Sequence, residues 1–237
     1  MSAPALRISG LDAFYGAAQA LFGLDLEVPE GSVTVLLGRN GAGKSTTLKA
    51  VMGLVDCGAG RVEVAGTDVA GWPVYRVSRL GVGYVPEDRR VFAGLSVAEN
   101  LVVGTRARPD ARVTWTDERV FALFPKLAEL RDRTAGQLSG GEQQMLTIAR
   151  TLMGNPDIVL LDEPSEGLAP VIVQQIAETV AALSGQGLTV LLSEQNVRFA
   201  SRVADRAAVI ERGRILVSGD MAEIAADPAV RDAYLTP

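Results

Sequence analysis

One loop constrains the fold of this chain more than any other feature of its sequence. Residues 38–45 read Gly-Arg-Asn-Gly-Ala-Gly-Lys-Ser, a G-x-x-x-x-G-K-[ST] pattern between a short strand at 32–37 and a helix predicted over 44–53. Glycines let such a loop curve and turn its backbone N–H groups inward around phosphate oxygens. Lys44 then supplies a charge for the β- and γ-phosphates, and Ser45 a hydroxyl for Mg²⁺. The pattern predicts a bound nucleotide on a strand–loop–helix unit.

The rest of the chain alternates strand and helix patterns around that loop. The strand at 32–37 has no polar face, which predicts a buried parallel strand covered by helices on both sides. Further strands are predicted at 6–13, 21–28, 158–161, 189–192 and 207–210, and a hairpin at 58–66. Helices are predicted at 97–103, 117–123, 126–131, 145–153 and 171–183, and an amphipathic helix at 220–235.

These patterns predict an α/β fold in a single domain over 1–237. Strands alternate with helices in 1–86 and again in 156–237, so we expect these two parts to form one core with a mostly parallel sheet. The part between them, 87–155, has only helical patterns. We predict that it is a helical lobe inserted in the core.

Composition excludes several other kinds of site. The chain has no histidine and a single cysteine, Cys57, which rules out histidine bases, disulfides within the chain and thiolate metal clusters. The net charge of −5 disfavours nucleic acid as a partner. No apolar run approaches the ~20 residues that span a bilayer. We therefore expect a cytoplasmic protein, whose membrane role would require a separate partner chain.

Two carboxylates follow the apolar run at 158–161. Asp162 and Glu163 stand at the carboxyl end of a predicted parallel strand, where such sheets bind their ligands. We predict that Asp162 holds the Mg²⁺ shell and that Glu163 orients and polarises an attacking water. A strand leaving the core through a polar turn would carry similar residues, so this assignment depends on the phosphate loop.

A second glycine motif, Leu-Ser-Gly-Gly-Glu-Gln-Gln at 138–144, begins another helix. Ser139 is a good N-cap. Gly140 and Gly141 follow in the first turn, where each glycine costs about 1 kcal/mol relative to alanine. A close approach to the backbone, suited to an anion, explains them better than capping alone.

Together, GRNGAGKST, LSGGEQQ and IVLLDEP resemble the nucleotide-binding domains of ABC transporters over essentially the whole chain. The resemblance implies a RecA-like P-loop NTPase core with an antiparallel β subdomain, and hydrolysis of ATP with Mg²⁺. The nucleotide-binding residues that it implies in the first motif are Gly38, Arg39, Asn40, Gly41, Ala42, Gly43, Lys44, Ser45 and Thr46. It also implies that Ser139, Gly140 and Gly141 contact ATP held by a second ATPase subunit, identical or different.

The resemblance implies roles for residues outside the glycine motifs. Tyr15 stands at the distance of the family's adenine-stacking aromatic, although a core aromatic would also fit there. Glu87 replaces the usual glutamine, and the resemblance places it at the nucleotide and its Mg²⁺. Gln195 replaces the usual histidine. Either the site is weakened or inactive, or Glu163 must be the base, with Lys44 assisting, and the Gln195 amide can hydrogen-bond the γ-phosphate. Ala169 stands where the family usually has an aspartate that contacts the other subunit.

A narrower resemblance concerns the transported solute. The stretches 84–92, 96–101, 163–170 and 193–196 are similar to one ATPase subunit of branched-chain amino acid importers. This implies transmembrane permease subunits, an extracytoplasmic solute-binding protein acting through them, no nucleic acid, and a peripheral position on the cytoplasmic face of the membrane. A related urea or amide importer remains an alternative, as does a soluble ABC ATPase. A P-loop kinase would not need LSGGEQQ.

The turn at 87–90 has two interpretations. It is either a solvated charged turn or the place where a coupling helix of the permease docks, as in family members. The apolar side chains that follow it are predicted to pack in the core: Val91, Phe92, Leu95 and Val97.

Overall fold

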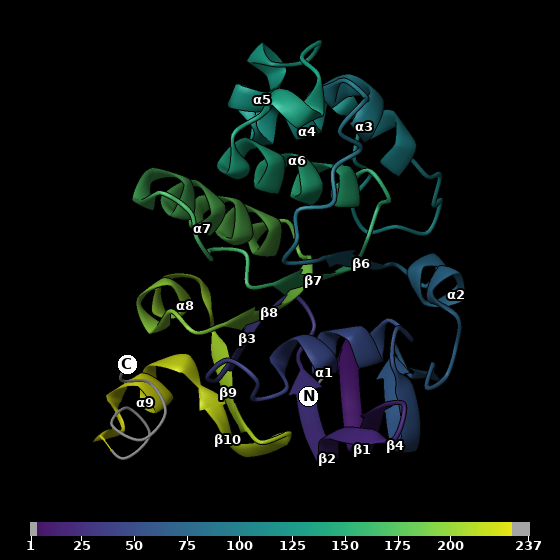
Figure 1. The fold of residues 1–237 in the computed structure, drawn as a ribbon, viewed down its shortest axis with the longest axis vertical. Coiled ribbons are helices and arrows are strands. Elements are labelled where there is room, and N and C mark those ends of the chain that lie inside the picture. Colours follow the sequence, from purple (N-terminus) through teal and green to yellow (C-terminus); the bar gives the residue numbers. More distant parts are fainter. Residues whose placement is uncertain (1–3, 229–237) are drawn as a thin grey trace.

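The structure is a computed structural model that describes residues 4–228, and its strands form two sheets (Figure 1). The larger sheet has the order β10-β9-β3-β8-β7-β6 and consists of β3 (Val33–Leu37), β6 (Val82–Val85), β7 (Ile158–Asp162), β8 (Thr189–Glu194), β9 (Arg206–Glu211) and β10 (Arg214–Asp220). The smaller sheet, β2-β1-β4-β5, consists of β1 (Leu6–Tyr15), β2 (Ala18–Val28), β4 (Asp56–Val64) and β5 (Thr67–Asp68).

Helices lie on both sides of the larger sheet. They are α1 (Lys44–Val51), α2 (Val74–Arg79), α3 (Val97–Gly104), α4 (Asp117–Leu123), α5 (Pro125–Glu129), α6 (Gly140–Leu152), α7 (Pro170–Gly185), α8 (Val197–Val203) and α9 (Met221–Ala226), with a short 3₁₀ turn at Ala135–Gln137. In Figure 1, α3 to α6 form a lobe at the top and the smaller sheet lies at the bottom. No helix in the described part of the chain is long and apolar enough to cross a membrane.

The larger sheet is parallel except for β10, and all five residues of β3 are buried. Helices cover both faces of β3, as expected, and the smaller sheet also covers one of these faces. Leu36 packs in a cluster with α1 and with the apolar side chains of the smaller sheet, such as Leu6 and Ile8. Because side chains alternate along a strand, an antiparallel sheet can present one apolar face and cover β3 as a helix would.

Most predicted elements are present, with shifted limits, but the hairpin predicted at 58–66 was placed too early in the chain. Residues 58–64 belong to one strand, β4, which pairs with β1, and the turn at 65–66 joins β4 to the short β5. Gly60 lies within β4 at an irregularity in the pairing, where a Cβ would run into the carbonyl of Gly10. Five helices and strands were not predicted: α2, β5, β6, α8 and β10.

Phe92 was predicted in the core, but it is 48% exposed because its ring packs under the guanidinium of Arg150, 4.9 Å from the ring centre, instead of inside the sheet. The predicted helix at 220–235 begins as α9, and the part from 229 onward lies outside the described residues.

The lobe lies between β6 and β7, which are neighbouring parallel strands. Side chains of the lobe and of the larger sheet form one continuous hydrophobic cluster, in which Leu101 and Leu146 belong to the lobe and Val35 and Val159 to the sheet. The limits of the lobe at 87 and 155 therefore remain a prediction.

Candidate functional site

The phosphate loop joins the end of β3 to the start of α1, as the sequence predicts. Gly43 caps α1 with φ of 114°, a left-handed conformation that side chains with a Cβ rarely adopt. A Cβ on Gly38 would lie 2.5 Å from the backbone oxygen of Ile210 on β9. The path of the loop therefore depends on glycine at both of its ends.

Lys44 folds back over this loop. Its Nζ donates hydrogen bonds to the carbonyl oxygens of Gly38 (2.8 Å) and Arg39 (3.1 Å), and it lies 3.0 Å from Oε1 of Glu163. The lysine is only 3% exposed, and a buried ammonium needs such partners. Its charge is thereby held in the hollow of the loop, facing the carboxylate.

Asp162, at the end of β7, is 1% exposed and accepts three hydrogen bonds from side chains. Oδ1 accepts from Ser45 Oγ of α1 (2.8 Å) and from Ser193 Oγ of β8 (2.7 Å). Oδ2 accepts from Tyr84 Oη of β6 (2.9 Å). The structure thus brings together Ser45 and Asp162, which the sequence predicts as partners, and adds two hydroxyl groups around the carboxylate.

Glu163 follows directly, with φ of 44°. Gln195, the first residue after β8, donates from Nε2 to Glu163 Oε2 (3.1 Å) and to Asn40 Oδ1 (2.7 Å). Burial raises the pKa of Glu163, but hydrogen bonds from Gln195 and Lys44 and the charge of Lys44 outweigh it, so the pKa lies below its usual value. Glu163 is therefore ionised and able to accept a proton.

Tyr84 and Ser193 are site residues that the sequence did not reveal. Burial and the negative charge of Asp162 raise the pKa of Tyr84, so its phenol stays protonated and can donate. Ser193 also accepts a hydrogen bond from the backbone N–H of Glu163 (3.0 Å). Both residues lie on the strands that flank β7, so the strand order was the signal that could have identified them.

Two more carboxyl groups lie near these strand ends. Burial raises the pKa of Glu194, although backbone N–H groups of Ser165 and Asn196 donate to its carboxylate, each at 3.2 Å. Burial, a hydrogen bond with Glu163 and that residue's negative charge raise the pKa of Glu166. Glu166 and Glu194 thus add two carboxyl groups to Asp162 and Glu163 at the ends of β7 and β8.

A cavity of about 510 Å³ opens beside the loop. It is lined by Gln19, Ala20, Phe22, Asn40, Gly41, Gly43, Lys44, Ser45, Thr46, Glu87, Glu163 and Arg212. Glu87 therefore lies at the same cavity as the lysine. Gly38, Arg39 and Ala42 line a smaller hollow of about 200 Å³ next to it.

Tyr15 lies near the cavity without lining it. Its ring is half exposed, and its Oη is 3.5 Å from Oγ1 of Thr46. An exposed ring at this place can stack on a flat base, and the interpretation of Tyr15 as a core aromatic does not fit its exposure.

The second glycine motif does not line this cavity. Ser139 caps α6 in a capping box with Glu142, as its N-cap pattern predicts. The close approach expected at the two glycines is made within the chain: a Cβ on Gly141 would lie 2.7 Å from Ile172 of α7, and one on Gly140 2.5 Å from Nη1 of Arg89. In a single chain this motif therefore lies apart from the phosphate loop.

The combined arrangement suits transfer of a phosphoryl group to water. It has a buried cation in a phosphate loop, an oxygen pair that could hold a hard cation, and an ionised carboxylate fixed by an amide. Among residues 4–228 no group of three or more His, Cys, Asp or Glu side chains could hold a metal by itself.

Comparisons with known proteins agree with this chemistry. The sequence profile of the ABC transporter family matches residues 21–166. The high-affinity branched-chain amino acid transport ATP-binding protein BraG of Pseudomonas aeruginosa is 44% identical over 97% of this chain and 99% of its own length. The lipopolysaccharide export system ATP-binding protein LptB of Escherichia coli (strain K12) is 34% identical over 97% of this chain and 96% of its own. An ATP-binding cassette of an ABC transporter, crystallised in its ADP conformation, superposes with a TM-score of 0.83 at 28% identity over 98% of both chains.

Proposed function

Because this chain belongs to the ABC transporter family of ATP-binding proteins, we propose that it powers the uptake of branched-chain or related amino acids. The chain is an ATPase subunit that is associated with the membrane and works with permease subunits. The observation that carries the enzymatic part of the proposal is the cluster in which Lys44 and Gln195 both contact the Glu163 carboxylate.

We place the phosphates of ATP between the backbone N–H groups of residues 38–46 and Lys44. Glu163 is then the general base: the oxygen of a water attacks the γ-phosphorus while the Glu163 carboxylate takes a proton from that water. The bond from the γ-phosphorus to the β–γ bridging oxygen breaks, and its electron pair leaves with ADP. Gln195 holds Glu163 in place, and we assign to its amide a hydrogen bond with the γ-phosphate.

We assign the Mg²⁺ ligands to Ser45 and Asp162, with Glu87 at the edge of the same cavity. Oγ of Ser45 and Oδ1 of Asp162 are 2.8 Å apart, and such oxygen atoms are the ligands that Mg²⁺ prefers. When bound, the ion neutralises charge on the phosphates. The hydrogen bond from Tyr84 keeps the carboxylate of Asp162 turned toward Ser45.

The proposal includes a second ATPase subunit. Ser139, Gly140 and Gly141 lie apart from this chain's own cavity, so we propose that they contact the γ-phosphate of ATP held by the partner, with Tyr15 stacking on the adenine of this chain's own ATP. Ala169 cannot supply the charged contact that an aspartate would. Two chains, identical or different, then enclose two ATP molecules.

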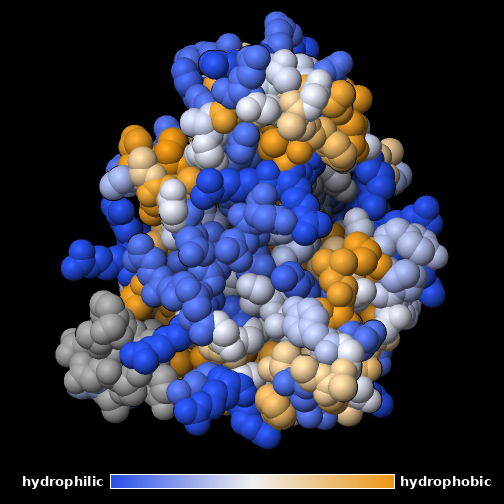
Figure 2. Space-filling view, viewed as in Figure 1, coloured by the Kyte–Doolittle hydropathy of each residue, from blue (hydrophilic) through white to orange (hydrophobic). Residues whose placement is uncertain are grey.

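A groove between α2 and the lobe is our candidate docking site for the permease. Its volume is about 570 Å³, and its lining includes Val74, Phe92, Val103, Arg106 and Arg150. Phe92 and Val103 are 48% and 53% exposed. Figure 2 shows hydrophobic surface near α3 and near α2 on this face. An amphipathic permease segment with an apolar face and acidic side chains fits this lining.

The choice of amino acids as the transported solute rests on similarity. The relative at 44% identity transports branched-chain amino acids by its name, whereas the relative named for lipopolysaccharide export is 34% identical over a similar length. The solute-binding protein acts only through the permease. A urea or amide importer remains the alternative.

The first test is uptake of labelled leucine, with urea in parallel, in source cells carrying Lys44→Ala. Loss of leucine uptake with urea uptake intact supports the proposal. Loss of urea uptake alone favours the alternative, and no change in either refutes both solutes.

A second test concerns the dimer. Glu163→Gln removes the base but keeps a similar shape, so ATP should hold this variant in a dimer with its proper partner. Size-exclusion chromatography with ATP checks this. A variant that stays monomeric with every partner refutes the two-chain arrangement.

A further inference from the structure

Arg89 has an unusual backbone where the chain leaves β6 for the lobe. Its φ is 46°, in the left-handed region that residues with a Cβ rarely adopt. The N–H of Val91 donates to the Arg89 carbonyl (2.7 Å), which closes a tight turn. A strained backbone of this kind persists only where its surroundings hold it, so the side-chain contacts of Arg89 indicate its role.

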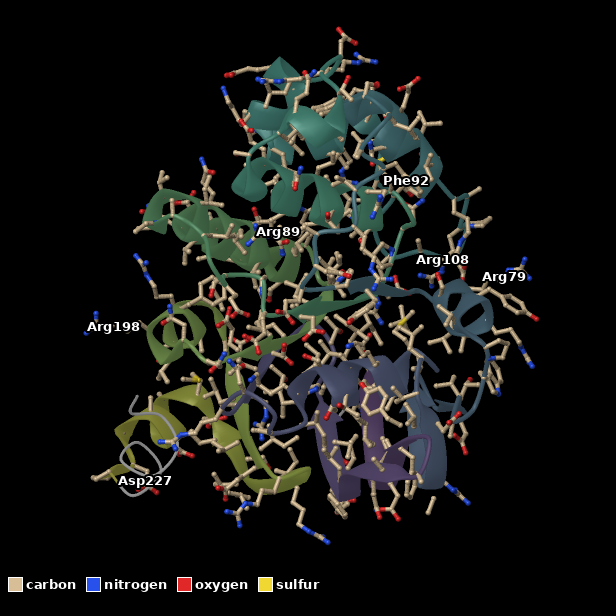
Figure 3. All side chains as sticks on the ribbon, viewed as in Figure 1. Arg79, Arg89, Phe92, Arg108, Arg198 and Asp227 are labelled. Carbon is tan, nitrogen blue, oxygen red and sulfur yellow. The ribbon has the colours of Figure 1, made fainter. Side chains whose placement is uncertain are left out.

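The guanidinium of Arg89 lies between the first turn of α6 and the loop after β7. Its Nη2 donates to the backbone oxygen of Glu166 (2.8 Å), in the loop after β7. Its Nη1 lies against the first turn of α6, so close that a Cβ on Gly140 would be 2.5 Å from it. Figure 3 shows Arg89 between the lobe and α7. One side chain therefore touches both the second glycine motif and the acidic loop of the core.

The carbonyl that Arg89 holds belongs to the turn that carries Glu163. The N–H of Glu166 donates to the carbonyl of Glu163 (3.2 Å), so residues 163–166 form one turn. Displacing the guanidinium frees one end of this turn, and the carboxylate of Glu163 stands at the other end.

We propose that Arg89 is a positioning residue that couples the second glycine motif to Glu163 within one chain. The proposal rests on the proposed two-chain arrangement, in which Gly140 meets the partner's ATP while Glu163 acts on this chain's own. A phosphate that arrives at Gly140 attracts the guanidinium lying there. The turn at 163–166 then responds, so the geometry of one ATP site depends on the occupancy of the other.

The neighbouring arginine provides a matched control. Arg90 is also cationic, but its side chain is 76% exposed and pairs with Asp88 at 2.7 Å. An exposed pair of this kind contributes little to stability or geometry. Arg90→Met therefore removes the same charge from the same turn without touching Gly140 or Glu166.

The test is ATP hydrolysis against ATP concentration in the complex with the partner ATPase and the permease subunits. For Arg89→Met we expect the Hill coefficient to fall to about 1 and kcat to fall about tenfold. ATP affinity and melting temperature of the isolated variant should match those of the unchanged chain. Arg89→Lys should restore part of the cooperativity, since an ammonium can donate to Glu166 but has no second nitrogen to lie against Gly140 as Nη1 of the guanidinium does. Arg90→Met should behave as the unchanged chain.

Several outcomes overturn the inference. One is an Arg89→Met complex whose Hill coefficient and kcat are unchanged, and another is an unchanged complex that shows no cooperativity at all. If isolated Arg89→Met also binds ATP more weakly or melts at a lower temperature, Arg89 has only a structural role. Failure of the proposed function itself gives a different result, because Lys44→Ala would then retain ATP hydrolysis.

Discussion

Ser193 connects two parts of the site through one hydroxyl, so Ser193→Ala is an informative change. The residue is 0% exposed; Oγ donates to Asp162 Oδ1 (2.7 Å) and accepts from the N–H of Glu163 (3.0 Å). Alanine removes both hydrogen bonds at once. It leaves a buried carboxylate with fewer donors and a buried N–H without its acceptor.

The magnitude follows from these two losses. A hydrogen bond to a charged group contributes about 1.5–3 kcal/mol, and a buried donor left unsatisfied costs about 1–3 kcal/mol. Because both contacts use the same hydroxyl, we expect the free energy of unfolding to fall by about 3 kcal/mol. For a chain of this size that lowers the melting temperature by roughly 6–12 °C. ATP hydrolysis should fall as well, because the backbone of Glu163, with its φ of 44°, loses a partner.

Urea unfolding of the full chain, followed by fluorescence, measures the first effect, and steady-state hydrolysis of ATP measures the second. Ser201→Ala is the control, since Ser201 lies exposed on α8 and its loss should change stability by less than about 0.5 kcal/mol. A free energy of unfolding of Ser193→Ala within about 1 kcal/mol of that of the unchanged chain would refute the assigned role of these two hydrogen bonds.

Four shorter predictions concern other parts of the chain. Tyr15→Ala should weaken ATP binding about tenfold in a titration while Tyr15→Phe keeps the affinity, because stacking on a base is worth about 1–3 kcal/mol; equal affinities for all three chains would rule out stacking. Gly38→Ala should lower both stability, by about 1–3 kcal/mol, and ATP affinity, because its Cβ meets the carbonyl of Ile210; an unchanged melting curve would contradict this. Phe92→Asp should abolish co-purification with the permease and leave ATP binding intact, and retained co-purification would place docking elsewhere. Glu194 has a raised pKa in the folded chain, so its contribution to stability is largest below the unfolded value of about 4.3 and is lost as pH rises through the folded pKa; urea unfolding across this pH range should show a weaker loss of stability with rising pH in Glu194→Gln, where Glu166 keeps its raised pKa, than in the unchanged chain, and equal pH dependence in both chains would contradict this.

The sequence predicted the parts of the site that depend on short-range patterns. The phosphate loop needs its glycines and lysine in a fixed order, and Ser139 caps α6 through a residue three positions away. The pair of carboxylates after an apolar strand is equally local. Such features are visible without knowledge of the sheet.

The remaining features depend on which strands become neighbours. Tyr84 and Ser193 reach Asp162 only because β6 and β8 lie on either side of β7. A hairpin was predicted over 58–66, but pairing with β1 makes Gly58 and Gly60 part of one strand. Phe92 has an apolar side chain of the kind found in cores, but in the structure its ring lies at the surface beside the guanidinium of Arg150. These outcomes depend on long-range packing that one sequence does not display.

The continuous hydrophobic cluster shared by lobe and sheet limits how the lobe can move relative to the sheet. A lobe with its own separate core could swing freely on its two connections, whereas this one must slide over side chains that stay in contact. Close-packed interiors resist compression, so displacements on the order of 1–2 Å are the natural scale for such shear. We therefore expect the lobe to displace a docked permease by only a short distance. This distance should depend on the packing beneath α6 and not on the length of the connecting loops.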